Sequence, residues 1–573
     1  MKIAAWTQPE REIRGSLAER LAALPMQLIL TAGAAILYLV LLSSNYSGEG
    51  IRWYRAATAS SPPAAGGPRH LLYPLLQWGW HRLLLLVGVG DSSIVANVAH
   101  LQALNAISGA AAVGLFYALL RDLDVDSLTA TAGTLLLMVS YVFAALATDM
   151  IEVMPSLTLA LAALLLAVHA RHVCGARAVA LHTAGAAGSL ALGTVIHQTA
   201  LLLGPSIAFA FAYGHVYDVP WQGWKRLGLR LAKQPAVWAF GALTLAFLVA
   251  IYLGTALALV TNNPGDAIAY ATGTPETIDY SPFSPLHVLA AVFGWANGVF
   301  GLVGWTNGTN LLHGGVRLTT LYNVGAVLAT LLLALGVLLV GVRVFREQSD
   351  RIYGWAVLLV AFVVPAAFAA FTWSVYVKLW LSPSVAWIGL LTLTLLDVRS
   401  RISARRASPS LRLVAPAAMG LLALVLAVGV GVHLIPTHIT TDAYLPEAEY
   451  LGQLVGPNDL LLAHGWDGVG ERFVLFYNEP YISFMQEGAN VNFQTDALVG
   501  DLEGAVRKTQ ARGGKVYTID ILDQPRSAWD PFFLQRLHVP YDALDRLRQA
   551  AQPLATAPKG LPEPVMVLAP LGS

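Results

Sequence analysis

The chain has 573 residues, of which 56% are hydrophobic and only 12% charged, and its mean hydropathy is +0.60. A soluble protein carries roughly 25% charged residues, so this composition indicates a polytopic membrane protein built from helices. The 35 lysines and arginines nearly balance the 34 aspartates and glutamates, so no overall charge favours a nucleic-acid partner. The single cysteine, Cys174, excludes an intrachain disulfide and a cysteine-based metal cluster.

Eleven apolar segments are long enough to cross a bilayer, since a spanning helix needs about 17–25 residues. In chain order they are 25–44, 93–120, 126–148, 153–170, 178–194, 197–213, 237–260, 319–342, 354–373, 379–396 and 413–434. No small-residue cleavage site follows the first apolar run, so we expect residues 1–24 to be an uncleaved tail.

Positive charge in the connecting loops predicts the orientation. Four loops on the side of the N-terminus are rich in lysine and arginine: 171–177, 221–233, 343–351 and 399–412. By the positive-inside rule that side is the cytoplasm. With an odd number of spans, the C-terminal part is expected outside.

Two further apolar stretches, 71–89 and 286–304, fit poorly as spans. Gln77, His81 and Arg82 interrupt the first, and the second would reverse the orientation of the basic loops. We expect helices that lie in the outer interface or re-enter the membrane. The alternative is that one of them crosses.

The composition changes near Pro436. Short apolar runs then alternate with polar, helix-like segments, which is typical of a small α/β domain. The sequence therefore predicts a transmembrane domain over 1–435, with a first outer loop at 45–92, and an extracytoplasmic α/β domain over 436–573.

The first outer loop is the one outer loop that breaks the charge rule. It carries a carboxylate and several basic side chains, namely Glu49, Arg52, Arg55, Arg69 and His70. Positive charge on this side suggests that an anion binds there. Glu49 is suited by position to act as a general base, or else it begins a short helix favoured by the dipole. Arg52 and Arg55 have the alternative role of binding lipid headgroups.

Several motifs in order resemble the GT-C superfamily of membrane glycosyltransferases, closest to its protein O-mannosyltransferase and aminoarabinose transferase branch. The likeness covers roughly residues 46–205. It rests on Ser47-Gly48-Glu49, an aromatic-rich helix, His70-x-x-Tyr73-Pro74-Leu75, Asp149-Met150-Ile151-Glu152-Val153 and His197-Gln198-Thr199. A body of about eleven spans with an outer α/β domain is also typical of that superfamily.

The resemblance implies a function. Members take a sugar from a polyprenyl-phosphate carrier on the non-cytoplasmic face and transfer it to an acceptor hydroxyl, with a first-loop carboxylate as base. That residue is Glu49 here, although many relatives have an aspartate-based motif and Tyr46 stands where a second acid would be. The resemblance further implies a bacterial inner membrane, a hexosyl or pentosyl group to be moved, and a glycan, lipid or protein as acceptor.

The leaving phosphate needs cationic partners, because its charge grows in the transition state. The candidates are Arg69, His70, His197 and Lys378, with Tyr73 and Gln198 as further substrate-binding residues. Lys378 has the alternative of extending to the membrane surface, and His197 that of a polar contact between helices.

Asp149 and Glu152 stand three residues apart at a predicted helix junction, so they could share one face. They could bind the acceptor, assist Glu49, or hold a divalent cation such as Mg²⁺ or Mn²⁺ through oxygen ligands. The alternative is that they cap the helix that begins before Pro155.

Two other functions stay open from the sequence. A transporter or flippase of a lipid-linked substrate is expected to contain two related halves, and the sequence shows no such repeat. A non-catalytic membrane scaffold is the other alternative.

Overall fold

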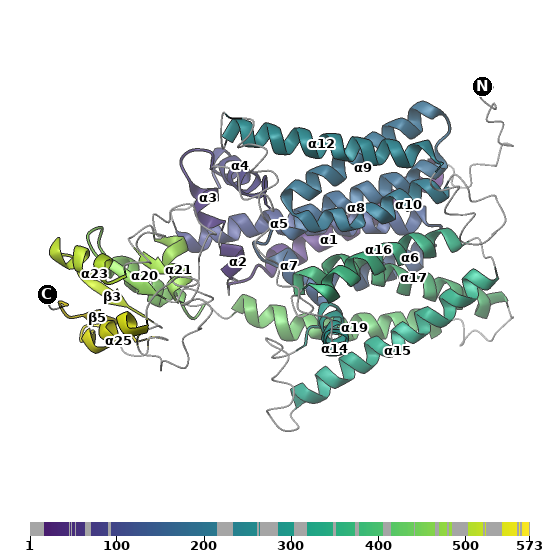
Figure 1. Ribbon diagram of the computed structural model, residues 1–573. Coiled ribbons are helices and arrows are strands. Elements are labelled where there is room, and N and C mark those ends of the chain that lie inside the picture. Colours follow the sequence, from purple (N-terminus) through teal and green to yellow (C-terminus); the bar gives the residue numbers. More distant parts are fainter. Residues whose placement is uncertain are drawn as a thin grey trace. The chain divides into compact units, whose positions relative to one another are not determined.

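The structure of the protein is a computed structural model (Figure 1). At some positions, Glu49 among them, it describes the backbone alone. It describes residues 17–573 except 45, 47, 52, 64–69, 90–92, 215–232, 260–262, 264–284, 303–317, 348–350, 373–376, 405–413, 440–441, 464–468, 478–480, 484–501, 520–521, 523–540, 559–560, 562–563 and 572–573.

The chain divides into two compact units, each made of segments that are not contiguous in sequence. The membrane unit comprises Met1–Leu42, Ser60–Val89 and Ala99–Pro436. The sheet unit comprises Ser43–Ala59, Gly90–Val98 and Thr437–Ser573.

The membrane unit is built from helices. Its α-helices are α1 (Leu17–Val40), α4 (Tyr73–Leu86), α5 (Ile94–Asp122, whose first turn belongs to the sheet unit), α6 (Ser127–Met138), α7 (Tyr141–Thr148), α8 (Val153–His169), α9 (Ala176–Ile196), α10 (Gly204–Gly214), α12 (Pro235–Leu259), α14 (Pro285–Phe300), α15 (Leu318–Arg346), α16 (Ile352–Phe371), α17 (Leu381–Ala404) and α19 (Val414–Ile439). Three short 3₁₀ helices join them: η1 (Ala170–His172), η2 (Gln198–Leu203) and η3 (Val377–Trp380).

A helix lies within each of the eleven predicted spans. Among the described residues, seven helices are long and apolar enough to cross a membrane, or eight if the bent pair α6 and α7 counts as one span. The remaining apolar helices, in α1, η2 with α10, α14 and α19, are shorter. The protein is therefore an integral membrane protein, and the count of eleven stays a prediction.

The predicted span 126–148 is bent. Its helices α6 and α7 meet at 59°. The hydroxyl of Ser140, at the break, donates to the carbonyl of Leu137 at 2.9 Å. A serine hydroxyl that takes a backbone carbonyl in this way competes with the helical hydrogen-bond ladder. The break changes the direction of the chain between α6 and α7. After α7 the chain continues through Asp149 and Glu152 into α8.

Close helix packing in the membrane unit uses small residues. Helices α8, α9 and α10 lie side by side (Figure 1), and α17 packs against α16 and α6. At the last contact, a Cβ atom on Gly133 of α6 would lie 3.0 Å from the Cβ of Thr392 in α17. Thr392 is held in place by its own helix, with its hydroxyl bound to the carbonyl of Ile388 at 2.7 Å.

We expect Gly133→Ala to lower the stability of the protein by about 1–3 kcal/mol, the usual cost of overpacking a tight contact. The matched control is Gly336→Ala in α15, where a new Cβ would meet nothing within 4 Å. Thermal unfolding in detergent measures both. Equal melting temperatures of the two variants would show that α6 and α17 are not in close contact at Gly133.

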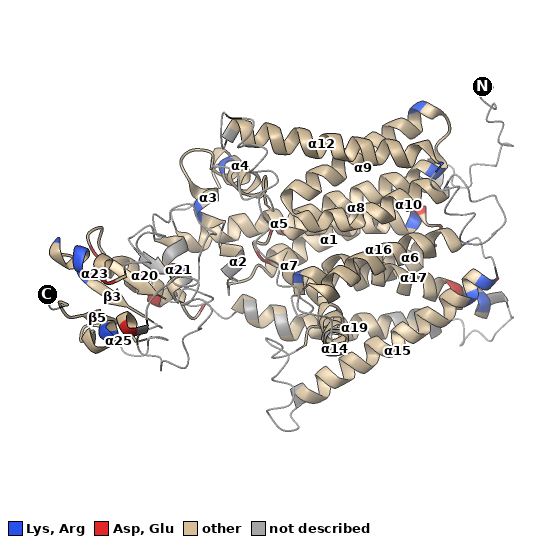
Figure 2. Ribbon diagram, in the orientation of Figure 1, with Lys and Arg blue, Asp and Glu red and all other residues tan. Residues whose placement is uncertain are grey.

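Basic and acidic residues gather at one end of the membrane unit (Figure 2). Arg399 pairs with Asp126 at 2.9 Å, Arg351 with Asp397 at 3.2 Å, and His169 with Asp122 at 2.6 Å. These pairs join the C-terminal end of α17 to the starts of α6 and α16, and the C-terminal end of α5 to that of α8. That end is the predicted cytoplasmic one, and the orientation itself stays a prediction.

The sheet unit contains a five-stranded sheet of order β2-β1-β3-β5-β4. Its central strand β1 (Leu460–Ala463) is parallel to β2 (Tyr481–Ser483) and β3 (Val516–Thr518), with Leu461 opposite Tyr481 and Tyr517. Strand β5 (Met566–Leu568) is antiparallel to β3 and to β4 (Ala551–Pro553).

Helices accompany this sheet, and apolar side chains of strands and helices form its core. The helices are α20 (Leu445–Leu454), α21 (Val469–Phe476), α23 (Leu502–Ala511) and α25 (Tyr541–Ala550). The core includes Leu460, Leu462, Leu502, Val506, Leu544 and Leu547. Two short helices from the N-terminal part of the chain, α2 (Gly48–Ile51) and α3 (Tyr54–Thr58), belong to the same unit and contact α21.

Candidate functional site

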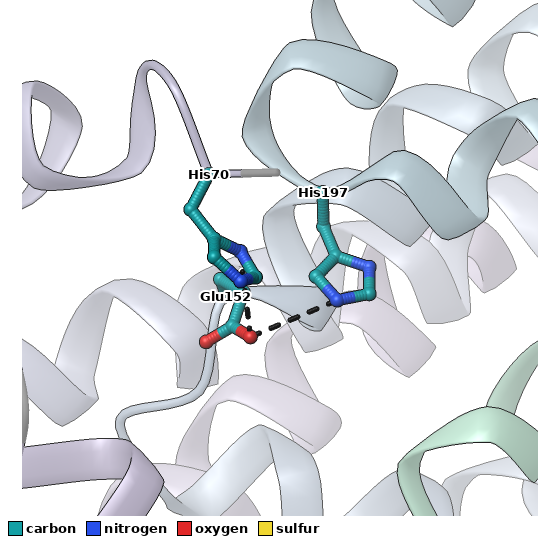
Figure 3. A group of neighbouring side chains, drawn as sticks. All are labelled: His70, Glu152 and His197. Atoms are coloured by element: carbon teal, nitrogen blue, oxygen red, sulfur yellow. Dashed lines mark ion pairs between the residues drawn. The ribbon is translucent and has the colours of Figure 1, made fainter. Parts of the chain in front are cut away.

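Three basic side chains from separate segments of the membrane unit meet around the carboxylate of a fourth residue. His70 precedes α4, Glu152 is the residue before α8, His197 joins α9 to η2, and Lys378 lies in η3. Figure 3 shows both imidazole rings turned toward the carboxylate of Glu152. We call these four residues the Glu152 cluster.

The distances in the Glu152 cluster are those of ion pairs. The Oε1 atom of Glu152 lies 3.6 Å from His70 Nδ1, 3.7 Å from His197 Nε2 and 3.5 Å from Lys378 Nζ. The two imidazole rings are 5.1 Å apart between centroids. The Glu152 side chain is only 3% exposed, and that of Lys378 is 12% exposed. One buried carboxylate thus holds three basic groups at a single point.

Backbone contacts fix the segments that carry the histidines. The N–H of Leu72 donates to the carbonyl of Val195 at 3.1 Å, which ties the His70 segment to the end of α9. The Ser156 hydroxyl lies 2.9 Å from the carbonyl of Gly193 and 3.1 Å from that of His197. Since Ser156 follows Glu152 by one helical turn, α8 positions both the carboxylate and the backbone of His197.

The side-chain amide of Asn105 in α5 supports the turn before Glu152. It donates to the carbonyls of Asp149 and Ile151, the first at 2.7 Å. Asn105 is fully buried. A buried amide needs such partners, so its bonds hold the α7–α8 turn in one shape.

The charge state of Glu152 follows from its neighbours. Burial raises the pKa of Glu152, but the charges of Lys378, His70 and His197 lower it further than burial raises it, and the net pKa lies well below its ordinary value of 4.5. The carboxyl is therefore ionised at neutral pH. It is suited to holding cations and poorly suited to accepting a proton.

The imidazole of His197 has a defined second partner. Its Nδ1 atom lies 2.6 Å from the hydroxyl oxygen of Thr199 and accepts weakly from the Thr199 N–H at 3.4 Å. A neutral ring that accepts at Nδ1 carries its proton on Nε2, the atom that faces Glu152. The ring can therefore donate toward the cluster in its neutral and its protonated form.

Tyr73 lies close to the cluster and is completely buried. Its hydroxyl oxygen accepts from the side-chain amide of Gln77 at 2.5 Å. Burial raises the pKa of Tyr73 well above 10.0; its hydrogen bonds with Gln77 and Asn105 lower it, and the charges of Glu152 and Asp149 raise it. The hydroxyl is therefore neutral at physiological pH.

Asp149 and Glu152 do not share one helix face, in contrast to the prediction from their spacing. Asp149 ends α7 with an extended backbone, and its carboxylate accepts from the N–H of Met150 at 2.7 Å. Glu152 occupies the position before α8, and its side chain makes no capping hydrogen bond. Spacing rules for helices fail here because the chain between the two acids is not helical.

The remaining predicted residues divide into three groups. Gln198 is exposed in η2, where its side chain bonds with that of Tyr252. Arg55 is half-buried in α3 of the sheet unit. Arg52, Arg69 and the side chain of Glu49 lie outside the described residues, so their roles stay predictions.

The sequence analysis missed the supporting residues Gln77, Asn105 and Ser156 as parts of the site. Each is a buried polar residue within a helix. Polar side chains in apolar helices are costly unless they have partners, and this is the signal that could have identified them.

The cluster also offers a set of metal ligands. One atom each of His70, Glu152 and His197 lie within 4.8 Å of one another, and among the described residues this is the one such group. Two imidazoles and a carboxylate are typical of zinc rather than of magnesium. Bond lengths of about 2.0–2.1 Å would place tetrahedral ligands about 3.3 Å apart, so these atoms would have to approach one another by up to about 1.5 Å to bind zinc.

Zinc binding can test the pairing of Lys378 with Glu152, because the ammonium of Lys378 and a zinc ion would compete for the same carboxylate oxygen. We expect Lys378→Met to bind Zn²⁺ at least about tenfold more tightly than the wild type, a gain of about 1.4 kcal/mol. Glu152→Gln should remove the binding. Equilibrium dialysis with metal analysis, on protein in nanodiscs, gives both affinities. Equal affinity of the wild type and Lys378→Met would contradict the pairing of Lys378 with Glu152.

Comparisons with known proteins identify the fold. No protein-family model and no curated protein sequence matches this chain. Among solved structures, apo ArnT from Cupriavidus metallidurans is 12% identical with a TM-score of 0.56, over 96% of this chain and 99% of that one. The apo oligosaccharyltransferase of Archaeoglobus fulgidus is 11% identical with a TM-score of 0.50, over 87% and 70% of the two chains.

A third structure is similar over most of this chain. The arabinofuranosyltransferase AftD from Mycobacteria is 15% identical with a TM-score of 0.50, over 96% of this chain and 40% of that one. The three structures belong to the GT-C superfamily of glycosyltransferases. The chain therefore has the GT-C fold, which confirms the fold family expected from the resemblance.

Proposed function

We propose that this chain, whose fold is that of the GT-C glycosyltransferases, moves a sugar from a polyprenyl-phosphate carrier to an acceptor hydroxyl on the extracytoplasmic face of the membrane. The Glu152 cluster is the observation that carries the proposal. Three basic side chains held at one buried carboxylate form a preorganised site for an anion. In a membrane protein, the anion that fits such a site is the phosphate of a lipid carrier.

The cluster acts on the leaving group. The acceptor oxygen forms a bond to the anomeric carbon while the bond from that carbon to the phosphate oxygen breaks, and the electron pair leaves with the phosphate. Lys378, His70 and His197 stabilise the charge that grows on that oxygen. Glu152 holds the three groups in place, so no reorganisation is needed during the reaction.

The acceptor proton needs a base, and Glu49 is our proposal for that role. The resemblance of Ser47-Gly48-Glu49 to the first-loop motif of the superfamily supports it. The state of Glu152 supports it too, because an ionised carboxylate held by three basic groups accepts a proton poorly. Direct attack from the face opposite the phosphate inverts the anomeric centre.

The other predicted residues receive roles that complete the reaction. We propose that Tyr73 donates a hydrogen bond at the phosphate and that Asp149, which is half-buried, contacts the acceptor. Arg52, Arg55, Arg69 and Gln198 contact the donor or the surrounding lipid headgroups. The sugar is a hexose or pentose, and the acceptor is a hydroxyl of a glycan, lipid or protein. The enzyme acts in a bacterial inner membrane, with its N-terminus in the cytoplasm.

Release of free polyprenyl phosphate tests this proposal. The protein in nanodiscs is incubated with polyprenyl-phosphate sugars, each labelled in the sugar, together with a membrane extract that supplies acceptors. We expect the label to move to an acceptor while polyprenyl phosphate accumulates. If the donor instead crosses the bilayer of sealed vesicles with its sugar bond intact, the protein is a flippase and the proposal is wrong.

A further inference from the structure

The segment that carries Glu49 folds with the C-terminal part of the chain. Ser43–Ala59 and Thr437–Ser573 belong to the same compact unit, although 377 residues lie between them in sequence. Helices α2 and α3 from the first segment contact α21 from the second. The position of the Glu49 backbone is therefore set by residues of the C-terminal part.

A buried ion pair binds the backbone just before α2. Arg472 of α21 pairs with Asp442 at 3.0 Å, and their side chains are 4% and 0% exposed. The N–H of Tyr46 donates to Asp442 Oδ2 at 3.2 Å, while the Nη2 group of Arg472 donates to the carbonyl of Tyr46 at 2.5 Å. The ion pair thus binds both the backbone N–H and the backbone carbonyl of Tyr46, three positions before Glu49.

The pair is also fixed from its own side. Asp442 Oδ1 accepts from the N–H of Tyr444 at 3.0 Å, and the N–H of Asp442 donates to the carbonyl of Ser44 at 3.0 Å. The Arg472 guanidinium lies 5.5 Å from the ring of Tyr444. These contacts leave the carboxylate and the guanidinium little freedom to move.

Aromatic contacts hold the other side of the segment. The ring of Phe476 in α21 meets the rings of Tyr46 and Tyr54 edge-on. The distances between ring centroids are 6.3 Å and 5.0 Å, respectively. The side chain of Asn97, from the Gly90–Val98 segment of the sheet unit, hydrogen-bonds the hydroxyl of Tyr54. Contacts at residues 46 and 54 therefore enclose the short helix that contains Glu49.

A buried ion pair contributes little to stability compared with well-packed apolar residues of similar volume. Its value lies in fixed geometry, since a guanidinium and a carboxylate bind a backbone segment in one register. We infer that Asp442 and Arg472, with Phe476, are positioning residues that hold Glu49 in place for proton transfer. This inference rests on the proposed function of Glu49.

The test combines hydrogen exchange with kinetics on the full-length protein in nanodiscs. The variants are Arg472→Met, Asp442→Asn and the milder Phe476→Leu. The control is Arg546→Gln, which removes the ion pair with Glu503 on the surface of the same unit. We expect the amides of residues 43–59 to exchange at least about tenfold faster in the three variants, in line with local opening, and at the wild-type rate in the control.

The kinetic signature is a loss of turnover without a loss of donor binding. A displacement of about 1 Å costs on the order of 100-fold in rate, so we expect kcat to fall by about that factor in Arg472→Met and less in Phe476→Leu. The KM for the polyprenyl-phosphate sugar should change far less than kcat, because the three basic residues that we propose bind its phosphate belong to the membrane unit. Arg472→Lys, which keeps the charge but not the planar fork, should be intermediate.

Three outcomes would overturn the inference, and they differ from a failure of the proposed function. Unchanged exchange over residues 43–59 would show that the pair does not hold the segment. A normal kcat in Asp442→Asn and Phe476→Leu would show that fixing the position of residues 43–59 is not needed for the reaction. If Arg472→Met also loses protection in β1 and β3, the unit has unfolded in that variant, and Asp442→Asn and Phe476→Leu decide instead. Faster exchange throughout the sheet in those two variants as well would reduce the ion pair to a structural role. If Glu49→Gln has normal turnover, the assignment of Glu49 as the base is wrong. The hydrogen-exchange rates of residues 43–59 would still show whether the ion pair holds that segment.

Discussion

Replacing Glu152 by glutamine is expected to lower kcat by about 10²–10³-fold, the cost of losing a preorganised electrostatic contact to developing charge. Glutamine keeps the shape of the side chain but removes the charge that holds Lys378, His70 and His197 together. Lys378 and the two imidazoles then lose the charged partner that they share and, with it, their common position. Sugar transfer by protein in nanodiscs, at saturating donor, measures the effect.

The matched control for Glu152→Gln is Asp122→Asn. Asp122, the last residue of α5, also pairs with a histidine, at 2.6 Å, but that histidine is His169, at the opposite end of α8 from Glu152. We expect this variant to keep turnover within about threefold of the wild type, as for a substitution distant from the site. If kcat falls equally in both variants, the loss comes from general damage to the helices of the membrane unit, and the Glu152 cluster has no special role.

We also expect the stability difference between the wild type and Glu152→Gln to depend on pH. The pKa of Glu152 in the folded protein lies below its ordinary value of 4.5, because the charges of Lys378, His70 and His197 outweigh burial, which raises it. A depressed pKa contributes stability that is fully present above the unfolded value and is lost as the pH falls through the folded one. The melting temperature of the wild type should therefore exceed that of Glu152→Gln at neutral pH, and the difference should shrink below pH 4.5.

Replacing Glu49 by glutamine is expected to lower kcat by about 10²–10⁴-fold, the range for losing a general base. The KM for the donor should change little, since the proposed phosphate site is made by other residues. Steady-state kinetics with a saturating acceptor separates the two constants. Glu503→Gln, on α23 of the same unit, is the control and should react at the wild-type rate.

A Glu49→Gln enzyme with normal turnover would remove Glu49 from the mechanism. The phosphate site would then need another base. Asp149 is the remaining described carboxylate among the predicted catalytic residues, because Glu152 is held as an ion by its neighbours. Asp149→Asn should in that case show the large loss predicted here for Glu49→Gln.

Much of the membrane unit could be predicted from the sequence because its signals are local. Long apolar runs predict helices, and a helix lies within each of the eleven expected segments. His70, Glu152, His197 and Lys378 could be singled out for a related reason, since each is ionisable and stands at the end of an apolar segment. The resemblance then added a reason for them to meet.

The parts that could not be predicted depend on contacts between distant segments. Nothing near Arg472 or Asp442 in the sequence indicates that the two bind the backbone of Tyr46. The bend at Ser140 was likewise missed, because hydropathy averages over the whole of 126–148 and a single serine hardly changes it. The spacing of Asp149 and Glu152 allowed them to share one helix face, whereas the chain turns between them.

Binding of polyprenyl phosphate itself tests the central claim most directly, since it needs neither the sugar nor the acceptor. The affinity of the protein in nanodiscs for a fluorescent polyprenyl phosphate is compared between the wild type, Lys378→Met and Arg343→Gln, a cation paired with Glu347 on the surface of α15. We predict that Lys378→Met weakens binding at least about tenfold, or 1.4 kcal/mol, and that Arg343→Gln has no effect. Equal affinity of the wild type and Lys378→Met would contradict the assignment of the Glu152 cluster as the phosphate site.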